Sequence, residues 1–413
     1  MAGNSLLTID MITQEAVMIF KNSNAFMQNI STQFDDSFGI QGAKIGSTLR
    51  VRLPLDYIVT DGPGLSAQDS VEQQTTLTLA TQRHVDLTFT SAEETLKVDD
   101  YANRFLLPAT NNLAGNVAST IMAGSEGGIC NIVANFDNAA TPNITRPTLE
   151  TVLSSQASLA ENSAPTLDHK FVLDPRTMAR MVSTLSGLLN PSTDISKQYR
   201  DGYVYNAAGY VWMQDQTAIK HTTGSFSAGT VNGAAQTGTT LVTNAITGTL
   251  KKGDIITIAG VNAVNRVTKQ SLQTVRQFVV TADVASGATA IPIYPAIVPG
   301  GAGYDAATGN GAQQYQTVDA SPANAAVISL FNKASEVYRK NIAFAPEAVT
   351  MVTADLGKPP NVECARKAYD GVSLRTLRAY VPGTDQTVTR LDILFGFLYV
   401  RPEWGVIVAD SIS

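Results

Sequence analysis

Hydrophobic and polar positions follow a β-strand pattern through one central stretch of the chain. The segment Thr249–Val261 (TLKKGDIITIAGV) opens with a tight turn at Lys251–Asp254, because glycine tolerates positive φ and aspartate bonds its own backbone. Three isoleucines follow at the spacing of a half-buried strand. Two further runs, Thr274–Val284 and Ala290–Ile297, come at the spacing of a small antiparallel barrel or sandwich. The pattern therefore predicts a small β module here.

The segments on both sides of this module carry little charge. His221–Thr239 precedes it and Pro299–Gln314 follows it, and both are rich in Gly, Ala, Ser and Thr. Beyond these flanks the apolar residues return to helical spacing. We therefore expect the β module to be inserted into a larger mixed domain.

A second alternating pattern predicts a long hairpin. Residues Ser47–Val59 alternate, the turn-rich Asp61–Gly64 follows, and the alternation resumes on the return through Val85, Leu87 and Phe89. Each strand would have about thirteen residues and a length of roughly 43 Å. A two-stranded ribbon of this size is marginal alone in water, so either a neighbouring subunit or the same chain must cover its apolar face. The leucines and valine of that face are Leu49, Val51, Leu53, Leu55, Leu77 and Leu79.

Helical periodicity predicts several helices outside the module. They are an amphipathic N-terminal helix over Ile9–Phe20, a long helix from the capping-box signature at Ser91 to about Gly124, a shorter helix over Thr148–Leu159, a helix capped by Asp174 with Pro175 at its first position, and one starting at Ser321-Pro322. Pro108 lies within the long helix and predicts a kink or a restart there. Methionines 178 and 181 are expected in the core.

Strands are predicted at the C-terminal end of the chain. Phe171–Asp174 reads as a strand paired with the helix that follows it in an α/β layer. Ile393–Val400 is nearly all apolar and should be buried on both sides. We expect Gly405–Ala409 to pair with it.

Several of these motifs, taken in order, resemble one protein family. YRDG (Tyr199–Gly202), the following Ala208-Gly209, LKKGDIITIAGV and the C-terminal ILFGFLYVRPEWGVIV (Ile393–Val408) are similar in order and spacing to the major coat proteins of P22-like short-tailed phages. Each motif is short, and their collinearity over most of the chain carries the resemblance. It implies an α+β chain with the Hong Kong 97-type capsid fold and an inserted barrel.

The resemblance also implies a division of the chain. The expected parts are an N-terminal arm (1–34), the extended-loop hairpin and spine helix of the peripheral domain (35–135), the first part of the axial domain (136–219), the inserted β-barrel (220–317), the second part of the axial domain (318–380), and C-terminal strands returning to the peripheral domain (381–413). In such a family the hairpin lies across an adjacent subunit.

The resemblance further implies the partners of the chain. They are other copies in hexamers and pentamers of an icosahedral shell, a scaffolding protein, a portal complex, and packaged double-stranded DNA held without sequence-specific contacts; a cement protein is left open. An acidic residue in the N-terminal arm of the family receives the basic tip of the scaffolding protein, and Asp10 is the matching position. Its alternative role is that of a solvated carboxylate at a helix start. The location implied is the virion, assembled in the host bacterial cytoplasm.

Composition agrees with a protein that covers its surface with copies of itself. Charged residues make up only 15% of the 413 residues, against about a quarter in ordinary domains, although a Thr/Ser-rich β protein would also show this. The net charge is −6 and no basic tract is present, so there is no footprint of tight nucleic-acid binding. Two distant cysteines fit a reducing compartment. We expect neither a signal peptide nor a membrane span.

No motif for catalysis, cofactor binding or metal binding is complete. His84 and Asp86 would share one strand face as an ion pair or a two-ligand metal fragment, which is weak alone. Asp168 and His169 are adjacent at a strand entry and should point to opposite faces. SFSAG (Ser225–Gly229) lacks the first glycine of a nucleophile elbow. We therefore expect a structural protein and no cofactor.

One departure from the family and two other functions stay open. The barrel loop that carries charged contacts in the family corresponds to Ala228–Thr240, which has no charge at all. A secreted or tail-associated adhesin would share the Thr/Gly/Asn-rich strands, but would usually show repeats of fixed period. A β-rich hydrolase is the third alternative, because sequence alone does not exclude a carboxylate pair.

Overall fold

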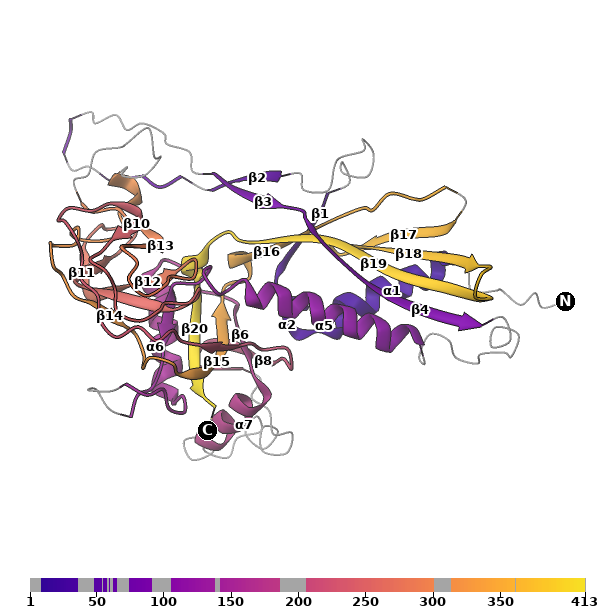
Figure 1. Ribbon diagram of the computed structural model, residues 1–413, viewed down its shortest axis with the longest axis horizontal. Coiled ribbons are helices and arrows are strands. Elements are labelled where there is room, and N and C mark those ends of the chain that lie inside the picture. Colours follow the sequence, from indigo (N-terminus) through magenta and orange to yellow (C-terminus); the bar gives the residue numbers. More distant parts are fainter. Residues whose placement is uncertain are drawn as a thin grey trace. The chain divides into compact units, whose positions relative to one another are not determined.

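A computed structural model describes residues 9–35, 48–53, 55–57, 59, 62–64, 74–90, 105–137, 142–185, 206–300, 313–360 and 362–412. The chain divides into two compact units, whose elements are labelled in Figure 1. The first unit combines residues 1–51, 75–121 and 349–400, and the second combines 52–74, 122–348 and 401–413.

A six-stranded sheet forms the centre of the first unit. Its strands run in the order β1 (Ser31–Asp35), β16 (Val349–Ala354), β19 (Gln386–Tyr399), β18 (Val372–Val381) and β17 (Glu363–Tyr369), and β4 (Thr81–Thr90) also pairs with β19. Helix α1 (Ile9–Ser23) packs against β17 and β18. The short helix α2 (Ala25–Asn29) follows, capped by the side chain of Asn24. Ala16, Val17 and Phe20 of α1 are fully buried, which confirms the predicted amphipathic helix.

Helix α5 (Leu107–Ala123) is the described part of the predicted long helix. Pro108 lies in its first turn, and Phe105 and Leu106, just before α5, have π-helical backbone geometry. The helical winding therefore changes next to Pro108, where the sequence predicts a kink or a restart. Leu113, Val117 and Ile121 are buried as predicted. Residues 91–104, with the capping signature and Tyr101, lie outside the described residues.

The predicted hairpin exists but its described strands are short. Strand β2 (Thr48–Arg52) pairs with β3 (Gln74–Thr78) in a two-stranded sheet. The return alternation through Val85 and Leu87 belongs instead to β4, which pairs with β19 over ten residues. The prediction of about thirteen residues per strand was wrong on the return side, because alternation does not reveal which strand is the partner.

In the second unit, a seven-stranded sheet carries helices α6 (Leu149–Glu161) and α7 (Pro175–Leu185). The strand order is β5 (Asn131–Val133), β20 (Gly405–Ser411), β15 (Val337–Phe344), β6 (His169–Leu173), β8 (Tyr210–Gln214) and β7 (Asn206–Ala207), with β9 (Lys220–Thr222) also on β15. The Thr148 side chain caps α6, and Asp174 caps α7 by accepting from the Arg176 N–H. Met178 and Met181 are buried in the core of this layer, as predicted.

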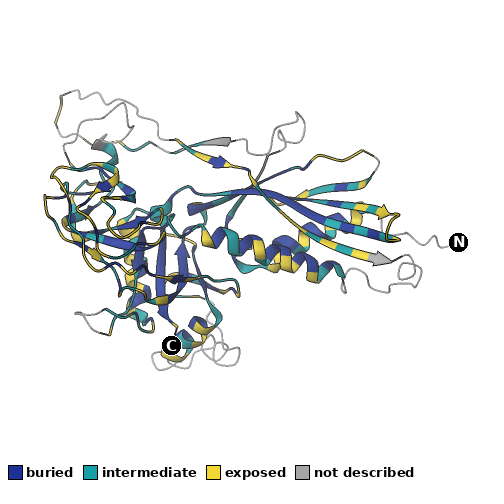
Figure 2. Cartoon of the chain, in the orientation of Figure 1, coloured by how far each residue is buried: buried dark blue, intermediate teal, exposed yellow. Residues whose placement is uncertain are grey.

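The inserted module is a five-stranded barrel-like sheet. Its order is β10 (Gly238–Val242), β13 (Ala290–Ile297), β12 (Ser271–Val280), β11 (Ile255–Val264) and β14 (Ile328–Leu330). Isolated bridges from Thr230 to Val327 and from Val231 to Thr243 close the sheet. The inner faces are buried (Figure 2), with Ile256, Ile258 and Phe278 fully covered. The predicted module is confirmed, and β14 extends its sheet past residue 317.

Two predictions on the C-terminal side were wrong. No helix starts at Ser321-Pro322; β14 and β15 stand there, and Ala325 and Ser335 have φ of 61° and 58°, which no right-handed helix allows. Pairing with β11 and with the sheet overrides the helical spacing of the apolar residues. Strand β20 does not pair with β19. It runs antiparallel to β15 and parallel to β5, so the C-terminal strand belongs to the second unit.

Candidate assembly surfaces and a buried charge cluster

The root of the hairpin is packed into the first unit. Leu77 and Leu79 are 1% and 0% exposed and share a core with Val352, Leu356 and Leu394. Gly396 of β19 lets this root approach, since a Cβ there would lie 2.5 Å from the Thr78 carbonyl oxygen. These two leucines are covered by their own chain, which corrects the expectation that a neighbour shelters them.

The outgoing side of the hairpin is less covered. Val51, Leu53 and Leu55 are half-buried, and the side chain of Leu49, in β2, lies outside the described residues. Further along, Tyr57 is 57% exposed and Val59 is 86% exposed. Part of the apolar surface of this strand is therefore not covered by the rest of its own chain.

Asp10 lies in the first turn of α1 and is largely open to solvent. Its side chain is 65% exposed, and its Oδ1 atom is 3.8 Å from Nζ of Lys367 on β17. An exposed ion pair of this length contributes at most about 1 kcal/mol. The carboxylate is thus available to a basic partner.

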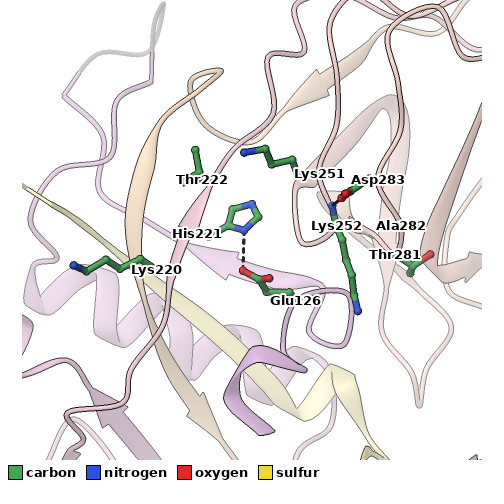
Figure 3. A pocket seen from close by; sticks show the side chains of 9 residues that line it. All are labelled: Glu126, Lys220, His221, Thr222, Lys251, Lys252, Thr281, Ala282 and Asp283. Carbon is green, nitrogen blue, oxygen red and sulfur yellow. Dashed lines mark hydrogen bonds and ion pairs between the residues drawn. The ribbon is translucent and has the colours of Figure 1, made fainter. Parts of the chain in front are cut away.

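A buried charge cluster lies where the inserted barrel meets the seven-stranded sheet, and Figure 3 shows two of its members, Glu126 and His221. The ring of His221, on β9, stands between two carboxylates: Nδ1 is 2.9 Å from Oε1 of Glu126 and Nε2 is 2.7 Å from Oδ1 of Asp254. The other oxygen of Asp254 accepts the backbone N–H groups of Gly224 (3.0 Å) and Lys251 (2.8 Å). The predicted turn at Lys251–Asp254 therefore exists, and its aspartate also binds the sheet.

The fourth member of the cluster is Lys340 on β15. Its side chain is fully buried, and Nζ lies 3.6 Å from Oε1 of Glu126 without a hydrogen-bond partner among the described residues. Burial lowers the pKa of Lys340 to about 8, although the charges of Glu126 and Asp254 act in the opposite direction. Burial alone would raise the pKa of Glu126, but the hydrogen bond with His221 and the charge of Lys340 outweigh it and lower that pKa.

Gly253 makes room for this cluster. Its φ is +94°, and a Cβ would lie 3.1 Å from Nζ of Lys340 and 3.2 Å from Cε1 of His221. Both the backbone conformation and the space therefore require glycine. A hollow of about 650 Å³ adjoins the cluster; Glu126 and His221 line it together with three lysines. Figure 3 shows those lysines, Lys220, Lys251 and Lys252, around the histidine ring.

The barrel has a second polar attachment on the β11–β12 side. Arg266 donates from Nε to Asp56 (2.8 Å) and from Nη1 to Glu403 (2.6 Å). The side-chain amide of Gln277 accepts the Ile132 N–H and donates to the Ile132 carbonyl oxygen, at 2.8 and 2.9 Å. Hydrogen bonds and charges thus hold the barrel at two places in the second unit.

The uncharged stretch Ala228–Thr240 is partly barrel wall. Val231 is buried in the barrel core, and the exposed turn after it is held by the side-chain amide of Gln236. That amide donates to the carbonyl oxygens of Asn232 and Val242, at 2.7 and 2.8 Å, and accepts the Val242 N–H at 2.7 Å. Backbone and amide groups therefore order this turn without any charged side chain.

The candidate catalytic motifs stay apart from one another in the structure. His84 forms an exposed ion pair with Asp86 (3.4 Å), as one alternative predicted. His169 is buried beside Tyr210, while Asp168 pairs with Lys170. Within the described ranges no group of three His, Cys, Asp or Glu side chains could hold a metal. No helix of the described residues is long and apolar enough to span a membrane, and Cys130 and Cys364 are free thiols.

Comparison with protein families decides the identity of the fold. Residues 1–409 match the family model described as P22 coat protein, gene protein 5. The chain belongs to the P22 coat protein family. It is a major capsid protein of a tailed phage with the Hong Kong 97-type fold, and the resemblance seen in the sequence is confirmed. This membership favours a structural role over the adhesin and hydrolase alternatives.

The P22-family chain is also similar to solved phage structures, at low identity. The structure from Mycobacterium phage Che8 has a TM-score of 0.45 at 11% identity, covering 93% of this chain and 90% of that one. The mature capsid of bacteriophage PhiM1 has a TM-score of 0.43 at 9% identity, covering 94% and 88%. The CUS-3 coat protein I-domain has a TM-score of 0.20 at 28% identity, covering 26% of this chain and 96% of that one. Comparison with curated proteins gives no match.

The sequence reasoning on this coat protein missed the charge cluster. Asp254 was assigned only to its turn, and His221 only to a flank of low charge. One signal was available: three polar residues, Arg339, Lys340 and Asn341, stand between apolar residues in the strand VYRKNIAF, and a charge that is buried there needs a partner. Its partners are distant in sequence, so the pattern alone could not name them.

Proposed function

We propose that this coat protein assembles through its hairpin into hexamers and pentamers of an icosahedral shell. Family membership over residues 1–409 supports a coat role, and the exposed Tyr57 and Val59 support the use of this strand as an interface. An exposed apolar strand gains hydrophobic free energy when a second copy covers it. The interface residues proposed on this strand are Leu49, Val51, Leu53 and Leu55.

The proposal includes the other components of a phage particle. Shell closure lets many modest contacts sum to a stable assembly. Scaffolding protein would guide that closure, and a portal complex would occupy one vertex. The net charge of −6 fits double-stranded DNA enclosed without sequence-specific binding. Particles would form in the host bacterial cytoplasm.

Leu53→Asp is expected to lower the yield of closed shells at least tenfold, because a carboxylate would have to be buried between subunits. Leu53 is only half-buried within one chain, so the free energy of unfolding of the monomer should fall by about 1 kcal/mol or less. Sedimentation and negative-stain microscopy measure the shells, and urea unfolding measures the monomer. Leu167→Asp is the matched control, since Leu167 is 81% exposed outside the hairpin. Normal shells from Leu53→Asp would rule out this interface.

Asp10→Asn is expected to weaken binding of the scaffolding protein about fivefold, the effect of losing roughly 1 kcal/mol from an exposed charge pair. The difference should disappear at about 1 M salt, where charges are screened within about 3 Å. Co-sedimentation with scaffolding protein at two salt concentrations measures both effects. Lys367→Met removes the partner of Asp10 in its own chain and should bind scaffolding protein at least as well as the unaltered chain. Equal binding of scaffolding protein by the unaltered chain and Asp10→Asn would mean that Asp10 is only a solvated carboxylate at the start of α1.

A further inference from the structure

The charge cluster joins four segments that are distant in the sequence. Glu126 lies in the turn after α5, His221 on β9 before the chain enters the barrel, and Asp254 in the barrel turn before β11. Lys340 lies on β15, after the chain has left the barrel. His221 is therefore the bridge between the barrel and the turn that follows α5.

Hydrogen counting favours an imidazolium at His221 when both carboxylates are ionised. Both ring nitrogens lie within 2.9 Å of a carboxylate oxygen, and an ionised carboxylate only accepts hydrogen bonds. A neutral imidazole carries one N–H, so one of the two contacts would join two acceptors. An imidazolium supplies both hydrogens, and charge-assisted hydrogen bonds of this kind are short.

The charges of the four cluster residues themselves sum to zero in that state. Asp254 and Lys340 are fully buried and His221 is 4% exposed. Within these four residues, two carboxylates, an imidazolium and an ammonium sum to zero, whereas a neutral ring leaves a net charge of −1. The ring of Tyr338, on β15, packs edge-on against the ring of His221, with 5.5 Å between the two ring centroids. The remaining charged groups facing the cluster are Glu336, Lys220, Lys251, Lys252 and Asp283.

We propose that His221 is held as an imidazolium and positions the inserted barrel against the turn that follows α5. Loss of its proton would break one of the two bridges. Asp254 is held by two backbone N–H groups, while the Glu126 side chain is 29% exposed beside the hollow. Glu126 would therefore turn away, and the hydrogen bond that joins the barrel through His221 to the turn at residues 125–128 would be lost.

The first test observes the histidines of the intact chain directly. The sequence has only three histidines, so labelled histidine gives three sets of ring signals in NMR spectra of the full-length monomer. At neutral pH we expect two ring N–H signals for His221, and a single one would overturn the proposal. As the pH is raised, loss of the second signal should coincide with lower amide protection factors at residues 125–128, that is, with exchange faster than the rise in the intrinsic rate alone. Loss of the signal with unchanged protection factors would also overturn it.

The second test uses variants of the same bridge. Glu126→Gln keeps the size of a side chain that is 29% exposed but removes its charge. It should lower the amide protection factors at residues 125–128 and 220–222 about tenfold and abolish the pH dependence of those factors. His221→Gln should do the same where it folds. His84→Gln is the matched control, because the His84 side chain is 45% exposed in a pair 3.4 Å long; it should change neither quantity. Protection factors that stay pH-dependent in Glu126→Gln would show that His221 does not act through Glu126.

Discussion

Asp392→Ala is expected to lower the free energy of unfolding by about 3–5 kcal/mol, the usual cost of removing one partner from a buried ion pair. The carboxylate of Asp392, in the middle of β19, is fully buried. Its Oδ2 atom accepts from Nε and Nη2 of Arg375 at 3.1 and 2.6 Å, and its Oδ1 atom accepts from Nε of Arg390 at 2.6 Å. Alanine would leave two guanidinium groups without their shared acceptor.

Urea unfolding of the unassembled chain measures this loss. Asp86→Ala is the matched control, because Asp86 also contacts Arg390, at 3.8 Å, but its side chain is 44% exposed. The control should lose about 1 kcal/mol or less. Similar losses in the two variants would mean that burial does not govern this network. Shell yield should follow the stability of the sheet, since β19 also carries the hairpin root at Gly396.

The local sequence pattern correctly predicted the elements that depend least on contacts with distant segments of the chain. The barrel strands, the caps at Thr148 and Asp174 and the buried face of α1 all follow from turn chemistry and periodicity over a few residues. The predicted helix after Ser321 failed because β14 gains its stability from pairing with residues of β11 that lie 70 or more positions earlier in the chain. Strand β20 was paired with the wrong neighbour for the same reason.

The same holds for the candidate surfaces: the local pattern identifies their residues, but contacts with distant segments decide whether those residues are buried. Alternation identified Leu77 and Leu79 as apolar face residues, but their burial depends on Leu394 and Leu356, which no local pattern connects to them. Asp10 could be matched through a family resemblance alone. The cluster around His221 unites residues from four separate segments, so the sequence pattern assigned Asp254 to a turn and His221 to a flank and connected neither of them to Glu126 or Lys340.

Lys340→Met should remove a pH dependence of stability that the unaltered chain shows in alkaline solution. The pKa of Lys340 is lowered by burial from 10.5 to about 8. Between these values the unfolded chain keeps the proton and the folded chain has lost it, so the unfolded state binds more protons and stability rises with pH. The rise amounts to about 2.5 pH units at about 1.36 kcal/mol each, or roughly 3 kcal/mol.

At pH 7 burial of the charged ammonium lowers the free energy of unfolding, so Lys340→Met should leave that free energy unchanged or raise it. The difference between the two chains should shrink as the pH approaches 10.5. The measurement is the difference between the urea unfolding free energies of the two chains at several pH values, in which the titration of tyrosines and other lysines cancels. Lys220→Met, an exposed lysine of the same hollow, should give a difference that does not vary with pH. A constant difference for Lys340→Met as well would mean that Lys340 keeps its ordinary proton affinity. The ammonium would then be stabilised by Glu126 and Asp254 as fully as by water, and the cluster would hold its charge at no cost to the fold.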